Sequence, residues 1–186
     1  LAVVVQLLVQ AEGAGILFTA NPLSGKRSEM VINAAWGLGE AVVGGLVTPD
    51  TITVDRTTGK VITRQTADKQ VMTVRTDHGT QEQPVPEALR KRAALNDTGA
   101  VELARLGAQI EQLYDMPMDI EWAWTASGGY AILQARPITG LRDAPIAWMP
   151  RNPKATYMRT SVADLMPDPL RPLFVTLGSP TLRQQM

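Results

Sequence analysis

Cysteine is absent from the 186-residue sequence, histidine occurs once, and aromatic residues make up only 5% of it. A chain without cysteine can form neither a disulfide framework nor a thiolate metal site. The same absence fits a reducing compartment, and we expect a cytoplasmic protein.

An excess of charge of one sign is also missing, because eighteen Lys and Arg side chains balance eighteen Asp and Glu side chains. A neutral chain gives no reason to expect binding to nucleic acid or to a membrane surface. Apolar residues make up 45% and charged residues 19% of the sequence, the proportions of an ordinary globular protein.

Long hydrophobic runs are missing as well. The opening apolar run, residues 1–9, is interrupted by Gln6 and is far shorter than the roughly 20 residues of a membrane-spanning helix. No basic segment precedes it, so it does not resemble a signal peptide. Its β-branched residues predict a buried strand, and because the first residue is Leu1 we expect a fragment of a longer protein.

Segments typical of strands dominate the first third of the chain. Apolar and β-branched composition predicts strands at residues 15–20, 29–35, 51–55 and 60–63. Turn residues at 21–25 separate the first two strands, and Thr57-Thr58-Gly59 predicts the turn of a hairpin between the last two.

Two helices are expected in the second half. One covers residues 87–95 after Pro86. The other covers residues 100–114, with Asp97 as its N-cap. Its apolar residues recur at steps of three and four, which predicts a core-facing stripe of Leu103, Leu106, Ile110 and Leu113.

Other stretches lack this periodicity. Residues 75–86 are polar, include the one histidine, His78, and are expected to form a surface loop. Four prolines between 137 and 153 predict an extended linker. We therefore divide the chain into a folded part, a linker and the truncated start of a helical domain, at residues 1–140, 141–156 and 157–186.

A hairpin over residues 118–135 carries the most informative pattern. Side chains alternate between the two faces of a strand, so Asp119 and Glu121 share one face. A turn at residues 126–129 places Glu121 opposite Gln134 and Asp119 opposite Arg136. The same register pairs Thr125 with Tyr130, Trp122 with Leu133 and Trp124 with Ala131.

The polar face of this hairpin suits nucleotide chemistry. Mg²⁺ prefers oxygen ligands, usually one or two carboxylates completed by phosphate and water, and Glu121 and Gln134 offer such oxygens. Arg136 offers a planar, charged fork for a phosphate. A plainer interpretation stays open: an ion pair between Asp119 and Arg136 beside a Glu–Gln hydrogen bond, on a solvated sheet face.

Three separated stretches carry a family resemblance: VVVQLLVQAEGAGILF at 3–18, NAAWGLGEAVVGGLVTPD at 33–50 and DIEWAWTASGGYAILQARPIT at 119–139. In this order they resemble the nucleotide-binding domain of the phosphoenolpyruvate synthase and pyruvate phosphate dikinase family, which rifampicin phosphotransferases share. The resemblance covers about residues 1–140. It implies an α/β (α+β) fold, the second lobe of an ATP-grasp domain, with a largely antiparallel sheet and helices packed on it.

The resemblance implies ATP and Mg²⁺ as cofactors and assigns roles at the hairpin. Glu121 and Gln134 match the positions that hold the metal. Asp119 matches a nearby acidic position that we group with the metal ligands. Arg136 matches a catalytic arginine that contacts phosphate.

The resemblance also implies an adenine-binding segment. The Gln6 carbonyl would accept from the exocyclic amine, the Val9 N–H would donate to the ring, and Glu12 would lie near the ribose. Two plainer interpretations stay open: residues 6–9 as a simple core strand, and Glu12 as a solvated loop acid.

Other motifs are weaker. Val42 stands where a dinucleotide-binding G-x-G-x-x-G motif needs its third glycine, although a role for Glu40 stays open. Gly25-Lys26 lacks the Ser or Thr of a phosphate-binding loop and is expected at a hairpin tip. Lys69 could reach a phosphate, but we expect a solvated surface charge.

The resemblance implies a dikinase-type phosphotransferase that cleaves ATP to AMP and phosphate. Phosphate would pass through a histidine outside this chain to a small-molecule acceptor such as rifampicin, since residues 157–174 resemble the central domain of rifampicin-phosphotransferase-type proteins. The first lobe and the phosphohistidine domain would also lie outside the chain, so the fragment alone is expected to be inactive. Two alternatives are a phosphoenolpyruvate synthase, with pyruvate as acceptor, and a non-catalytic nucleotide-binding module.

Overall fold

The computed structural model describes residues 3–77, 79–126 and 128–141. Its elements are β1 (Gly13–Phe18), β2 (Glu29–Trp36), α1 (Glu40–Val43), β3 (Asp50–Asp55), β4 (Val61–Gln65), β5 (Val71–Thr76), β6 (Gly79–Pro84), α2 (Glu87–Arg90), α3 (Asp97–Tyr114), β7 (Met118–Trp124) and β8 (Tyr130–Pro137). His78 and, apart from residue 141, the predicted linker and helical start at 141–156 and 157–186 lie outside the described residues, so those predictions stay predictions.

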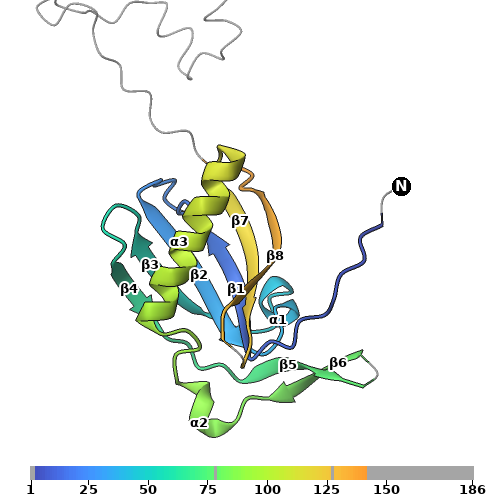
Figure 1. The fold of residues 1–186 in the computed structure, drawn as a ribbon. Helices are drawn as coiled ribbons and strands as arrows, with labels where there is room; N and C mark the ends of the chain where they lie inside the picture. The colour runs from blue at the N-terminus through green and yellow to red at the C-terminus, as the bar shows by residue number, and fades with distance from the viewer. Residues whose placement is uncertain (1–2, 78, 127, 142–186) are drawn as a thin grey trace, which may run out of the picture. The chain divides into compact units, whose positions relative to one another are not determined.

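Six strands form one antiparallel sheet in the order β4-β3-β2-β1-β7-β8, while β5 and β6 form a separate two-stranded ribbon (Figure 1). β7 follows α3 in the chain and pairs with β1 along its whole length. The hairpin β7–β8 therefore completes a sheet whose other four strands come from the first third of the chain. The predicted α+β architecture, with a largely antiparallel sheet and a helix packed on it, is confirmed.

The core lies between this sheet and α3, which crosses one face of it (Figure 1). One row of the core runs across four strands, because the registers place Ile120, Leu17, Ile32 and Ile52 opposite one another. All four side chains are fully buried. Burying an aliphatic side chain of this size stabilises the fold by about 1.5–3 kcal/mol.

The face of α3 that packs on the sheet differs from the predicted one. Its buried residues are Gly99, Ala100, Leu103, Ala104 and Gly107. Of the predicted stripe only Leu103 is fully buried, and Leu113 is 79% exposed. Small residues let the helix backbone approach the sheet closely, so Leu103 is the one large side chain of the predicted stripe that is fully buried, while Ile110 packs at the border of the core.

The start of α3 also differs by one residue from the prediction. Asn96 is the N-cap, and its Oδ1 accepts a hydrogen bond from the Gly99 N–H at 2.7 Å. Asp97 is the first residue of the helix, and its carboxylate instead accepts from the Arg64 Nε at 3.0 Å. Asn and Asp have similar preferences for the N-cap, so composition alone did not separate them.

The predicted loop at residues 75–86 is wrong, since β5 and β6 pair there as a hairpin. Every residue of β6 is exposed, so the strand lacks the alternation of apolar and polar residues that marks a half-buried strand. The predicted helix at 87–95 is shorter, a single turn at α2. The predicted tip at Gly25-Lys26 is confirmed, because it lies between the paired strands β1 and β2.

The predicted buried strand at residues 3–9 is wrong. None of the described strands pairs with this segment, and Val5 is 94% exposed. A strand is buried only when other elements cover it, whereas a hydrogen bond from the Gln6 side-chain amide to the Leu133 carbonyl, at 3.4 Å, joins this segment to the edge of the sheet. Apolar composition alone therefore does not make this segment part of the core.

Candidate functional site

The β7–β8 hairpin has the predicted register where its polar residues lie. Asp119 stands opposite Arg136, and Glu121 stands opposite Gln134. β7 is held between β1 and β8, so its side chains stand on a strand paired on both sides. Alternation places these side chains on the face of the sheet away from α3, because the intervening Ile120 is in the core.

Toward the turn the register differs from the prediction by one residue. Trp122 pairs with Ile132 instead of Leu133, and Trp124 pairs with Tyr130 instead of Ala131. The shift falls between Glu121 and Trp122, so Leu133 is the extra residue of a β-bulge. The predicted pairing of Thr125 with Tyr130 is thus replaced, and the turn begins at Thr125.

The bulge changes where neighbouring side chains point. In a regular strand Leu133 and Gln134 would face opposite sides of the sheet, but both line the same hollow. The Leu133 carbonyl accepts the hydrogen bond from Gln6 that joins the N-terminal segment to this edge of the sheet. Alternation in the sequence gave no signal for this bulge.

This hollow, which we call the main hollow, has a volume of about 580 Å³. One wall is the N-terminal segment, which includes Gln6 and Val9, and another is the start of α1 with Leu38 and Glu40. Glu121, Ala123, Leu133 and Gln134 complete the lining from the hairpin. Four of the predicted site residues, which are far apart in the sequence, thus meet in one place: Gln6, Val9, Glu121 and Gln134.

Arg136 and Asp119 lie one pleat further along the hairpin and do not line the main hollow. The Nε and Nη2 atoms of Arg136 both lie 2.9 Å from Asp119 Oδ2. The arginine side chain is 57% exposed and the aspartate side chain 11%. The ion pair considered from the sequence is therefore present, and it leaves much of the guanidinium open to solvent.

Glu12 lies beside the main hollow. Its backbone N–H donates to the Trp124 carbonyl at 3.0 Å, and its carbonyl accepts from the Gly37 N–H at 2.8 Å. Its side chain lines a neighbouring polar hollow with Arg75 and Asp77. Both hollows share Ala11 and Leu38. Glu12 is therefore adjacent to the wall of the main hollow that the N-terminal segment forms.

The wall that carries Leu38 and Glu40 is attached to the β5–β6 ribbon. The Leu38 N–H donates to the Thr73 carbonyl at 2.8 Å, and Glu40 Oε2 accepts from Thr80 Oγ1 at 3.2 Å. Gly37 precedes this wall with a φ of 81°, a conformation that glycine adopts without steric cost. The sequence gave Glu40 no defined role, and the structure brings it to the hollow.

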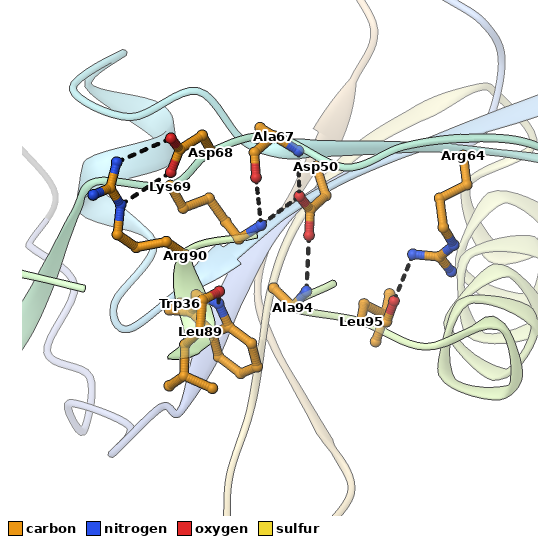
Figure 2. A network of polar contacts seen from close by, with 10 residues as sticks. All are labelled: Trp36, Asp50, Arg64, Ala67, Asp68, Lys69, Leu89, Arg90, Ala94 and Leu95. Atoms are coloured by element: carbon orange, nitrogen blue, oxygen red, sulfur yellow. Dashed lines mark hydrogen bonds and ion pairs between the residues drawn. The ribbon is translucent and has the colours of Figure 1, made fainter. Parts of the chain in front are cut away.

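Lys69 is not the solvated charge predicted from the sequence. Its side chain is fully buried, and its Nζ lies 2.6 Å from Asp50 Oδ1 (Figure 2). Because a fully buried ammonium is held by this carboxylate, Lys69 is unavailable to a phosphate at the surface. The pairing crosses 19 residues of sequence, and no local pattern indicated it.

The described residues contain no group of three or more His, Asp and Glu side chains placed to hold a metal ion. Glu121 and Gln134 are instead two oxygen-bearing side chains beside one cation, Arg136. Such an incomplete set fits Mg²⁺, which usually takes one or two carboxylates and completes its shell with phosphate and water. None of the helices in the described part of the chain could span a membrane.

An antiparallel sheet covered by a helix on one face, with a hollow that joins apolar walls to a carboxylate and an amide, is consistent with a lobe of an ATP-grasp-like domain. Comparison with known proteins agrees. The model of the pyruvate phosphate dikinase AMP/ATP-binding domain family matches residues 1–154. The chain belongs to this family.

Several curated relatives are similar to the chain. The probable phosphoenolpyruvate synthase of Methanocaldococcus jannaschii is 47% identical over 76% of this chain and 12% of its own length. The phosphoenolpyruvate synthase of Pyrococcus furiosus is 43% identical over 79% of the chain and 19% of its own length. The rifampicin phosphotransferase of Streptomyces sviceus is 38% identical over 100% of the chain and 21% of its own length. The chain thus spans about a fifth or less of these relatives.

Proposed function

We propose that this chain is the ATP- and magnesium-binding part of a larger, dikinase-type phosphotransferase. The full protein would cleave ATP to AMP and phosphate. Phosphate would then pass through a histidine outside this chain to a small-molecule acceptor, of which rifampicin is the example that the relatives suggest. The fragment alone would be inactive, because further parts of the nucleotide site would come from the rest of the protein.

One observation carries the proposal: Glu121 and Gln134 face each other across β7 and β8 on the wall of the main hollow. In this arrangement the two side chains would hold Mg²⁺ on the phosphates of ATP. Arg136, two residues further along β8 and half exposed, would contact a phosphate oxygen. Phosphoryl transfer depends mainly on such positioning and on neutralising charge.

The main hollow also suits a nucleobase. Leu38, Val43 and Leu133 give it apolar walls, and the backbone of residues 6–9 borders it. The Gln6 carbonyl would accept from the exocyclic amine of adenine, and the Val9 N–H would donate to the ring. Glu12, in the adjoining hollow, would lie near the ribose.

The choice of acceptor depends on the residues after the nucleotide-binding part. The match to a rifampicin phosphotransferase extends over the whole chain, whereas the matches to phosphoenolpyruvate synthases cover 76% to 79% of it. This supports the rifampicin-phosphotransferase type. A phosphoenolpyruvate synthase, with pyruvate as acceptor, is the second candidate, because identity over the shared part is higher, at 47%.

The test is phosphorus NMR of the full-length protein with Mg²⁺ and ATP, alone and then with rifampicin or pyruvate. We expect AMP, inorganic phosphate and one phosphorylated acceptor. Glu121→Ala should abolish the magnesium-dependent cleavage and leave the fold intact. Glu82→Ala, on the fully exposed strand β6, is the matched control and should turn over normally.

Two results would contradict the proposal. Formation of ADP alone would exclude the dikinase reaction, and intact ATP would favour a nucleotide-binding module without turnover. Normal turnover by Glu121→Ala would show that this carboxylate does not hold the metal.

A further inference from the structure

We propose that Asp119 positions Arg136 and is not a ligand of the metal. This inference rests on the proposed function, because it assumes that Arg136 contacts a phosphate and that Glu121 holds Mg²⁺. It departs from the grouping of Asp119 with the metal ligands that the sequence resemblance suggested.

The ion pair between Asp119 and Arg136 restricts how the arginine is oriented. Two nitrogen atoms of the guanidinium, Nε and Nη2, each lie 2.9 Å from a single oxygen, Asp119 Oδ2. The hydrogen bond from Nε and the ion-pair contact of Nη2 with the same oxygen restrict the orientation of the guanidinium. Arginine otherwise carries about 2 kcal/mol of rotamer entropy, so an oriented side chain presents its other N–H groups to a phosphate at a lower entropic cost.

The Asp119 carboxylate is poorly accessible to a metal ion. Asp119 Oδ1 has almost no accessible surface and no hydrogen-bond partner among the described residues. Phe18 stands opposite Asp119 on β1, and Arg136 stands opposite it on β8. A hydrated Mg²⁺ ion could reach Oδ2 only by displacing Arg136. It could reach Oδ1 only if the atoms that cover this oxygen moved apart.

Glu121 differs from Asp119 in its surroundings. That side chain lines the main hollow, as Gln134 does, whereas Asp119 and Arg136 do not. The cross-strand pair Glu121 and Gln134 therefore lies one pleat away from the cross-strand pair Asp119 and Arg136. We assign metal binding to the pair in the hollow and phosphate contact to the oriented arginine of the other pair.

The experiment compares Asp119→Asn with Glu121→Gln in the full-length protein. Both replace a carboxylate by an amide of nearly the same shape. ATP cleavage is measured as free Mg²⁺ is varied. We expect Asp119→Asn to lower the rate at saturating Mg²⁺ by about 10- to 100-fold, the scale of a charged hydrogen bond, with no change in the Mg²⁺ concentration for half-maximal rate. Glu121→Gln should raise that concentration by about tenfold or more.

A double-mutant cycle separates positioning from a general structural effect. In an Arg136→Ala background, Asp119→Asn should cause no further loss of rate, because it acts through the arginine. Arg136→Lys keeps the charge but loses the planar fork. It should reproduce the loss of rate caused by Asp119→Asn while the buried Asp119 side chain stays unchanged.

The chain offers a matched control in Glu111. Its carboxylate also pairs with an arginine, Arg56 Nη1, at 2.8 Å. Its second oxygen is also buried and without a partner in the described part of the chain. It lies on α3, away from the main hollow, so Glu111→Gln should leave both the rate and the Mg²⁺ dependence unchanged.

The outcomes are distinct. A raised Mg²⁺ requirement in Asp119→Asn, with Glu121→Gln behaving as expected, would overturn the inference and leave the proposed function standing. Additive losses in the double mutant, or an unchanged rate in Asp119→Asn, would also overturn it. If Glu121→Gln leaves the Mg²⁺ dependence unchanged, the proposed metal site fails, and this inference fails with it.

Discussion

Lys69 Nζ lies 2.6 Å from Asp50 Oδ1, and neither side chain has any exposed surface. The same carboxylate accepts hydrogen bonds from the backbone N–H groups of Ala67 and Ala94, each at 2.8 Å (Figure 2). One buried aspartate thereby joins the start of β3, the segment before β5 and the connection to α3. It indirectly supports the β5–β6 ribbon, whose Thr73 carbonyl holds the wall of the main hollow.

We predict that Lys69→Met destabilises the protein by about 3–5 kcal/mol, because it leaves the Asp50 carboxylate buried without its cation. Unfolding in urea measures the free energy. Lys26→Met is the control, since Lys26 pairs with Glu29 at 2.7 Å with 62% of its side chain exposed, and such pairs contribute about 0–1 kcal/mol. Similar losses in the two variants would contradict the prediction.

The cap of α3 gives a second prediction. Asn96→Ala should destabilise the protein by about 0.5–2 kcal/mol, because the Gly99 N–H loses its acceptor. Asp97→Ala, one residue later, removes only a surface ion pair with Arg64 and should cost about 1 kcal/mol or less. A larger loss for Asp97→Ala in chemical denaturation would restore the N-cap predicted from the sequence.

Gly37→Ala should destabilise the protein by more than Gly45→Ala. Both glycines have positive φ, 81° and 69°, so each substitution carries a backbone cost of about 1–2 kcal/mol. A Cβ at Gly37 would also collide with the Thr73 carbonyl, whereas nothing lies within 4 Å of one at Gly45. Nucleotide binding should weaken only in Gly37→Ala, since the Thr73 carbonyl positions Leu38 in the hollow wall. Equal losses of unfolding free energy in the two variants would contradict the predicted effect of the collision at Gly37.

We predict that the Tyr130 phenol causes a loss of stability at alkaline pH. Burial, and secondarily the negative charge of Glu102, raise the pKa of its phenol above the ordinary value of 10.0. The folded protein therefore keeps this proton to higher pH than the unfolded chain does. Above about pH 10 the unfolded chain binds fewer protons, so stability falls as pH rises through the raised pKa. Tyr130→Phe keeps the ring against Trp122 and should flatten this part of a plot of unfolding free energy against pH. An unchanged slope in Tyr130→Phe would show that the phenol does not cause the loss.

Much of the sheet could be predicted from the sequence, because Leu17, Ile32, Ile52 and Ile120 alternate with residues of the other face. That periodicity reports directly on which side of a strand is buried. The β5–β6 ribbon could not be predicted in this way. Its strands are stabilised by pairing with each other, and the exposed residues of β6 carry no apolar pattern.

The candidate site, like the sheet, could be predicted from the sequence only in part. The cross-strand positions of Glu121 with Gln134 and of Asp119 with Arg136 follow from strand geometry once a hairpin is assumed. The bulge at Leu133 does not follow, because an extra residue can be accommodated at the turn or within a strand. The structure accommodates it within the strand, where it brings Leu133 beside Gln134 at the main hollow.

By itself the sequence determined the alternating strands, the polar face of the β7–β8 hairpin and the family to which the chain belongs, because each depends on residues that are close in the chain or on motifs in a fixed order. Only the tertiary structure decided that Lys69 is buried against Asp50, that the small residues of α3 face the sheet, and that Gln6 and Glu40 meet the hairpin at one hollow. These relationships depend on which elements cover one another. Contacts between distant segments are selected by packing and by the need to pair buried charge, and no local periodicity records them.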